Sequence, residues 1–245
     1  MEKTQLTRRL FLGGGVVSIA AGTQSVAETI KGHEPWLPHQ ADKPSANDSP
    51  TYRFFSPKEV EFMEAATERI CPHDELGPGA KECRVALFID HQLAGGYGRA
   101  DSWYMQGPWS KGQETQGYQS RLSPSDMYRT AIAAIEKVTA ARHGGQSFAA
   151  LSPDDQDAIL QEIESGKAEL EGADAKTFFK MLLLNTKEGM FCDPIYGGNK
   201  DMAGWKMIGF PGARYDYRDW VGRHGERYSE PPVGIAGRPD WNQQS

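Results

Sequence analysis

Three cysteines and six histidines are the residues whose types could support metal or redox chemistry. The cysteines are Cys71, Cys83 and Cys192. A metal site would add His73 or His91, but the spacing matches no standard zinc or iron–sulfur pattern. A disulfide suits an oxidising compartment better, and Cys71 and Cys83 bracket a Pro- and Gly-containing turn between two expected helices, so we predict that they form the pair. Cys192 then has no cysteine of this chain left to pair with, which favours either a buried free thiol or a bond to another chain.

The familiar catalytic motifs do not occur in the sequence. No Gly-rich phosphate loop follows a strand pattern, and the glycines at 95–98 have the wrong spacing for one. There is no Cys-x-x-Cys-His for attached haem, no Gly-x-Ser-x-Gly elbow and no His-Glu-x-x-His pair. We therefore expect no catalytic residue, no cofactor-binding residue and no metal ligand in this chain.

Charge and hydropathy narrow the class of protein further. The chain has 245 residues, with 27 Lys and Arg against 33 Asp and Glu, a formal net charge of −6. This balance argues against nucleic acid as a partner, because phosphate binding needs a basic face. A mean hydropathy of −0.60 with a single short apolar stretch excludes a multi-span membrane protein. The hydrophobic fraction of 38% still suffices for a packed core.

The first 27 residues match a twin-arginine export signal. Arg8 and Arg9 precede a weakly apolar, Gly-interrupted stretch over 11–21, and the stretch ends at a small-x-small cleavage site whose last residue is Ala27. The alternative is an ordinary N-terminal tail or a basic amphipathic helix. The sequence predicts a periplasmic protein of a bacterium, exported by the twin-arginine translocase. Because that route carries folded proteins, the chain either folds around a cofactor before export or travels with a partner that does.

Helical patterns occupy the middle of the chain. Ser56, Ser123 and Ser152 each begin a Ser-Pro-x-acid pattern, which places Ser at an N-cap and Pro at the first helical position. With apolar residues at 3–4-residue steps, these patterns predict helices over 57–70, 81–94, 124–142 and 153–164, and a fifth that opens near 174. The fifth is apolar all round and is expected to be central. No segment alternates with period two, so we expect a mainly α protein with about five helices in a single domain over 52–195.

Long segments rich in Gly, Pro and aromatic residues surround this domain. We interpret 28–51 as an extended arm, whereas 95–121 and 193–245 hold five of the six Trp. Irregular loops of this length are usually functional or disordered, and such a density of rings does not suit disorder. Because Trp and Tyr are enriched at interfaces, we predict that 196–245 forms a hallmark loop and tail that bind a partner. The expected interface residues are Tyr196, Trp205, Phe210, Tyr215, Tyr217 and Trp220. The alternative is that the rings fold back over the helices.

The segment Asp193–Gly212, with the sequence DPIYGGNKDMAGWKMIGFPG, resembles the hallmark of the gluconate 2-dehydrogenase subunit 3 family. Shorter matching segments extend the resemblance to about 52–215, and the twin-arginine leader is also typical of the family. These segments are 55–59, 69–72, 79–82, 88–95 and 148–153.

The resemblance implies a small (gamma) subunit of a membrane-associated flavoprotein dehydrogenase. In such complexes the large subunit holds FAD, and a multihaem cytochrome c subunit passes electrons to quinone. The small subunit carries no cofactor and assists maturation and export of the large one, which fits a twin-arginine signal on a chain without cofactor motifs. The expected localisation is the periplasm, with association to the inner membrane through the partner subunits.

Gluconate 2-dehydrogenase is the complex that the resemblance favours. A related 2-ketogluconate, fructose, glucose or sorbitol dehydrogenase is an alternative, because the substrate pocket lies in another chain. A metal-binding periplasmic enzyme that uses Cys71, His73, Cys83 and Cys192 is a second alternative, and a scaffold for some other partner is a third.

Overall fold

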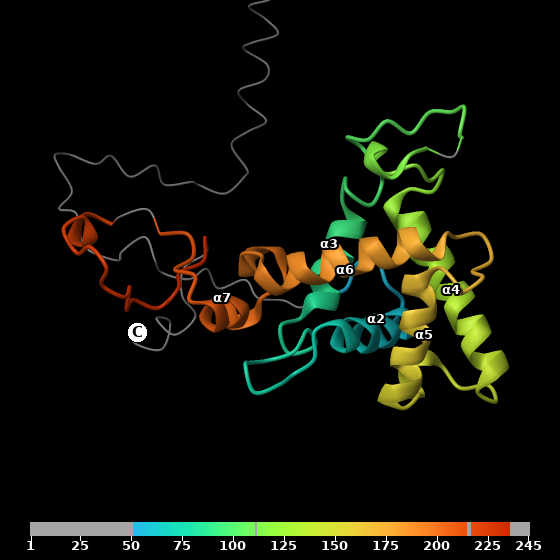
Figure 1. Cartoon of the computed structure of the whole chain (residues 1–245), viewed down its shortest axis with the longest axis horizontal. Helices are drawn as coiled ribbons and strands as arrows, with labels where there is room; N and C mark the ends of the chain where they lie inside the picture. Colours follow the sequence, from blue (N-terminus) through green and yellow to red (C-terminus); the bar gives the residue numbers. More distant parts are fainter. Residues whose placement is uncertain (1–50, 111, 215–216, 236–245) are drawn as a thin grey trace, which may run out of the picture. The chain divides into compact units, whose positions relative to one another are not determined.

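A central helix, α6 (Ala175–Phe191), contacts the other five α-helices of the part described in the computed structural model (Figure 1). The part described comprises residues 51–110, 112–214 and 217–235. Within these ranges the fold is mainly α, as predicted, with no strand and two isolated β-bridges. The surrounding helices are α2 (Pro57–Ile70), α3 (Val85–Ala94), α4 (Pro124–Arg142), α5 (Pro153–Ser165) and α7 (Ala203–Ile208). Short 3-10 turns are η2 (Glu114–Gln116), η3 (Phe148–Ala150), η4 (Pro194–Tyr196), η5 (Lys200–Met202) and η6 (Arg218–Trp220).

Several sequence predictions lie outside the described residues. They are the export signal with Arg8 and Arg9, the cleavage site at Ala27, the arm over 28–50 and the interface residue Tyr215. All of the described residues belong to one compact unit. The expected division between a helical domain and a tail at residue 195 stays a prediction.

The three Ser-Pro helix starts are confirmed. The Ser56 backbone N–H donates to Glu59 Oε2 at 2.8 Å, which is one half of a capping box at the start of α2. Ser123 and Ser152 each accept from the N–H three residues on, at 3.2 Å in both α4 and α5. These caps satisfy N–H groups that would otherwise lack a partner, which explains why each helix begins where it does.

Two expectations about the helices need correction. The helix predicted over 81–94 begins only at Val85, because Arg84 adopts a left-handed backbone with φ of 56° that an α-helix cannot continue through. In addition, α7 lies within the hallmark segment and was not predicted. Its six residues are too few to show a helical hydrophobic period.

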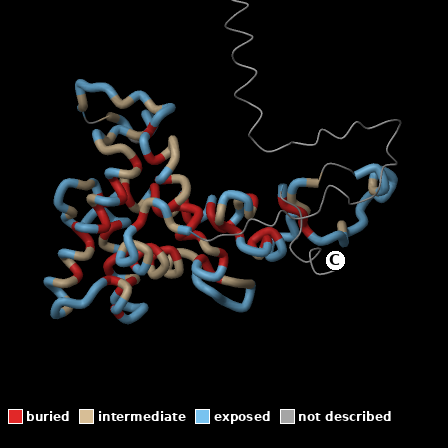
Figure 2. Tube along the Cα trace, turned by 180° about the vertical axis from the view of Figure 1, so that it is seen from behind, coloured by how far each residue is buried: buried red, intermediate tan, exposed pale blue. Residues whose placement is uncertain are grey.

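The core forms where the surrounding helices meet α6, and Figure 2 shows buried segments along these contacts. Phe178 and Leu182 of α6 are fully buried, and the Phe178 ring lies 5.4 Å from that of the equally buried Tyr128 on α4. The prediction that α6 is central is therefore confirmed. It is not buried all round, however, because 52% of Leu184 is exposed.

A buried carboxylate on α3 fixes the point at which the chain enters the domain. Asp90 accepts three backbone N–H donors, from Arg53 at 2.6 Å, Phe54 at 2.9 Å and Phe55 at 2.7 Å. The neighbouring His91 Nε2 lies 3.1 Å from Thr51 O. Charge-assisted bonds of this kind are stronger than neutral ones, so residues 53–55 are held firmly on α3.

The segment 95–121 is anchored to the core at its base. Tyr97 shares a buried hydrogen-bond network with Asn185 of α6, whose Nδ2 also donates to Tyr128 Oη at 3.0 Å. The Tyr97 ring packs at 5.7 Å on Trp103, which in turn packs at 4.9 Å on Tyr118. These three aromatic rings therefore pack on one another in series and support the loop.

Candidate partner-binding surface

The hallmark segment Asp193–Gly212 folds around a buried asparagine. Asn199 has no exposed surface and adopts a left-handed backbone with φ of 45°. Its Nδ2 donates to Cys192 O and its Oδ1 accepts from Gly204 N, both at 2.8 Å. Its own backbone N–H donates to Gly189 O at 2.9 Å. One residue thus joins the end of α6 to the start of α7.

Glycines allow the hallmark backbone to lie against α6. A Cβ on Gly198 would be 2.4 Å from Gly189 O, and a Cβ on Gly204 would be 2.1 Å from Met190 O. Carbon and oxygen cannot approach so closely, so only glycine permits the observed packing. Gly198 and Gly204 are therefore required by the contact of the hallmark backbone with the end of α6.

Gly204→Ala is expected to lower the free energy of unfolding by about 2 kcal/mol, because the methyl group would push α7 away from Met190 O. In an open helix the same change would be stabilising. Urea unfolding followed by circular dichroism measures the loss. Gly222→Ala is the matched control, since nothing lies within 4 Å of a Cβ there. Equal stability of the two variants would contradict close packing of α7.

Trp205 lies beneath the surface of the hallmark segment. Only 5% of the residue is exposed, and its Nε1 donates to Phe191 O at 2.7 Å. Its ring packs edge to face on Phe210, with centroids 5.2 Å apart. Within this chain Trp205 therefore supports the exposed ring of Phe210, and its contact with a partner stays a prediction.

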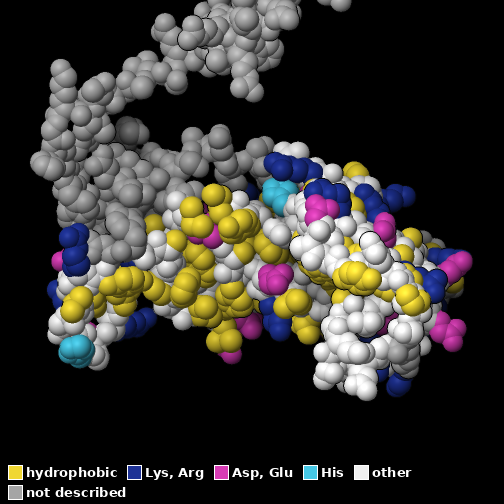
Figure 3. Space-filling view, turned by 90° about the horizontal axis from the view of Figure 1, so that it is seen from above, with side chains coloured by type: hydrophobic (Ala, Val, Ile, Leu, Met, Phe, Trp, Pro, Cys, Tyr) yellow, Lys and Arg dark blue, Asp and Glu magenta, His cyan; other side chains and the backbone are white. Residues whose placement is uncertain are grey.

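Six exposed large hydrophobic residues lie between residues 191 and 210, at the end of α6 and in the hallmark segment. They are half of the twelve such residues that the described structure exposes. We call them the hallmark surface: Phe191, Ile195, Tyr196, Met207, Ile208 and Phe210. In the view of Figure 3, hydrophobic side chains cluster near the middle, over α7 and the end of α6. Clustered exposed apolar residues usually mark an interaction site.

The rim of the hallmark surface combines apolar and basic residues. Leu76 is exposed in the adjacent turn, and a Cβ on its neighbour Gly77 would lie 3.1 Å from Met207 Sδ. Lys200 and Lys206 are also exposed. An apolar centre with a polar rim is the usual arrangement of a protein–protein interface.

The remaining predicted interface residues lie in the segment 213–235. Tyr217 is exposed, whereas Trp220 is half-buried against Tyr228, with ring centroids 4.7 Å apart. This segment returns to the hallmark segment, because Ile235 N donates to Asp193 Oδ2 at 2.7 Å and Val233 N donates to Pro211 O at 3.2 Å. The structure thus brings the tail and the hallmark segment together, and their role in binding stays a prediction.

Sequence reasoning missed four residues of the hallmark surface, namely Phe191, Ile195, Met207 and Ile208. The prediction selected aromatic rings within irregular segments, so it passed over aliphatic side chains and a ring assigned to a helix. The sequence feature that could have indicated these residues is the high density of apolar residues after the end of α6, where they follow no helical period.

The three cysteines are free thiols in the structure. Burial raises the pKa of Cys83 to about 11 and that of Cys192 to about 12, and it also raises the pKa of Cys71. The thiols are therefore protonated at neutral pH, which does not suit a nucleophile. The Cys71–Cys83 disulfide stays a prediction.

The described residues contain no group of three or more His, Cys, Asp or Glu placed to hold a metal ion. The alternative of a metal-binding enzyme thus finds no ligand set in this part of the chain. Among the helices in the same ranges, none has the length and apolar character that a membrane crossing requires.

In the part of the chain that the structure describes, the fold and the surface define a small all-α protein with a clustered apolar surface. The chain belongs to the family "Gluconate 2-dehydrogenase subunit 3", whose model matches residues 57–212. The match ends at the last residue of the hallmark segment, so it includes the whole hallmark surface. Comparison with curated proteins and with solved structures gives no significant match.

Proposed function

We propose that this chain is the non-catalytic small subunit of a periplasmic, membrane-associated flavoprotein–cytochrome dehydrogenase, of which gluconate 2-dehydrogenase is the leading candidate. Its role is to bind the FAD-containing large subunit and to assist its maturation and twin-arginine export. Oxidation of gluconate to 2-ketogluconate belongs to the FAD subunit, and electron transfer to quinone belongs to a multihaem cytochrome c subunit that also provides membrane association.

The observation that carries this proposal is the hallmark surface within the family-matched segment. Its apolar residues are exposed on a backbone that Asn199, Gly204 and Trp205 hold in place. A surface that is already rigid loses little conformational entropy on binding, which favours stable association. Lys200, Asp201 and Lys206 are exposed beside these apolar residues, and charged groups at the margin can fix the orientation of a partner.

The export role predicts that the large subunit depends on the signal of this chain. The double substitution Arg8→Lys with Arg9→Lys is expected to leave the FAD subunit in the cytoplasm. It should reduce periplasmic dehydrogenase activity at least about tenfold. Cell fractionation with immunoblotting and FAD fluorescence measures this result. A leader without the paired arginines cannot be read by the translocase, and a large subunit that travels with this chain is then retained.

Lys3→Arg is the matched control, because it keeps the leader's charge and both arginines. It should leave export of both chains unchanged. If the FAD subunit still reached the periplasm with full activity when this chain was retained, the export role would be wrong. Co-purification of the two chains from wild-type membranes tests their association separately.

A further inference from the structure

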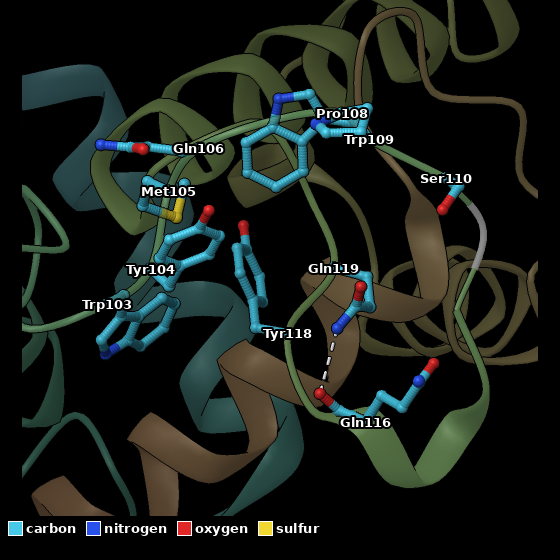
Figure 4. A pocket seen from close by; sticks show the side chains of 10 residues that line it. All are labelled: Trp103, Tyr104, Met105, Gln106, Pro108, Trp109, Ser110, Gln116, Tyr118 and Gln119. Atoms are coloured by element: carbon cyan, nitrogen blue, oxygen red, sulfur yellow. Dashed lines mark hydrogen bonds between the residues drawn. The ribbon is translucent and has the colours of Figure 1, made fainter.

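The loop 95–121 contains a cavity of about 560 Å³ that the proposed function does not use. Figure 4 shows the side chains around it, with Trp109 on one side and Tyr104 and Tyr118 facing it from the other. Trp103 completes the aromatic wall. Cavities of about 300–1,000 Å³ are typical of small-molecule sites, so this one has the size of a ligand pocket.

The aromatic wall is held in place by the rest of the loop. Trp103 packs between Tyr97 and Tyr118, and Tyr97 is bound to the buried Asn185 of α6. Tyr118 Oη donates to Leu122 O at 2.8 Å. Burial raises the pKa of Tyr118, so its hydroxyl remains protonated and keeps this bond over the neutral range. Trp103 and Tyr118 are thus held in place before any ligand arrives.

The polar side of the cavity consists of amides. Gln119 Nε2 donates to the backbone oxygen of Gln116 at 3.0 Å, and this bond is drawn in Figure 4. The Oε1 atom of Gln119 lies on the opposite side of its amide group. Gln116 Oε1 accepts from Gln113 N at 2.6 Å, which leaves its Nε2 as a donor. Gln106 and Ser110 also line the space. The amide side chains of the lining thus provide both hydrogen-bond donors and hydrogen-bond acceptors.

We infer that this cavity binds a neutral saccharide ring. The apolar C–H face of a pyranose can pack on an aromatic ring such as Trp109, while its hydroxyl groups pair with amide donors and acceptors. The ten described residues that line the cavity carry no charge, so a neutral hydroxylated ring fits them without burying an unpaired charge. The lining therefore favours a ring-closed neutral sugar over an open-chain acid.

This inference is independent of the proposed function, because the cavity shares no residue with the hallmark surface. A saccharide in the loop would give the small subunit a ligand of its own, separate from the substrate of the catalytic subunit. Failure of one proposal leaves the other untouched.

The test uses the purified full-length chain with three probes of matched carbon number. Glucose is neutral and ring-closed, glucitol is neutral and open, and gluconate is charged and open. Tryptophan fluorescence and saturation-transfer NMR should detect glucose with a dissociation constant on the order of 1 mM, as expected for a ligand of this size. Glucitol and gluconate should bind at least about tenfold more weakly.

Two substitutions locate the binding. Trp109→Ala should weaken glucose binding at least about tenfold, and Tyr104→Ala, at a residue that is 81% exposed, tests the same wall without a cost to folding. Trp220→Ala is the matched control for fluorescence and should leave binding unchanged. Equal affinity for glucose and gluconate, or no glucose binding by the folded chain, would overturn the inference.

Discussion

Asp90→Ala is expected to lower the free energy of unfolding by about 4 kcal/mol. The buried carboxylate accepts the N–H groups of Arg53, Phe54 and Phe55, and alanine would leave three donors without a partner. Each bond to a charged group contributes about 1.5–3 kcal/mol, and relaxation of the segment recovers part of the loss. Urea unfolding of the purified chain measures the change.

Two comparisons separate this effect from a general loss of charge. Asp90→Asn keeps one acceptor oxygen but points an N–H₂ group at a donor, so it should fall between wild type and Asp90→Ala. Asp101→Ala removes an exposed carboxylate that pairs with the side chain of Arg99, and it should change stability by less than about 0.5 kcal/mol. If Asp90→Ala were as stable as Asp101→Ala, the hydrogen bonds of Asp90 to residues 53–55 would contribute little to the stability of the fold.

The second large effect concerns binding. Ile195→Asp with Ile208→Asp should weaken association with the FAD subunit at least about 100-fold, because two exposed apolar side chains of the hallmark surface become charged and costly to desolvate. Both residues are exposed in this chain, so its own stability should change little. Biolayer interferometry with the purified FAD subunit measures the affinity, and urea unfolding measures the stability.

The control for the binding prediction places the same charges on exposed hydrophobic residues elsewhere. Leu184→Asp with Tyr104→Asp adds two acidic groups outside the hallmark surface. This variant should bind the FAD subunit as the wild type does. Unchanged affinity of the hallmark variant, or equal loss in both variants, would show that the hallmark surface is not the interface.

The sequence predicted the helices best where local chemistry decides the outcome. Ser56, Ser123 and Ser152 begin helices because a cap and a proline act within a few residues of each other. Arg84 was not foreseen as a helix boundary, because its left-handed backbone depends on how 80–85 packs rather than on residue type. Local signals thus place most of the helices and miss breaks set by tertiary contacts.

The candidate site was predictable in position but not in detail. The hallmark segment and its aromatic residues pointed to 193–212, which the family match includes. Composition could not separate the supporting Trp205 from the exposed Phe210, because both are large rings. Nor could it reveal that Asn199 is buried, since the partners of its side chain come from the ends of two different helices. Such roles follow only from the three-dimensional arrangement.

The two contacts that return the tail to the hallmark segment have a consequence for its dynamics. Asp193 bonds to Ile235, and Pro211 and Ala213 both bond to Val233, which closes a loop of about twenty residues at its base. Few buried residues lie between these contacts, so the loop depends on them for its order. Opening of the base would release the whole segment in one cooperative step. Amide hydrogens over 217–230 should therefore exchange together, at a rate set by the opening of these contacts.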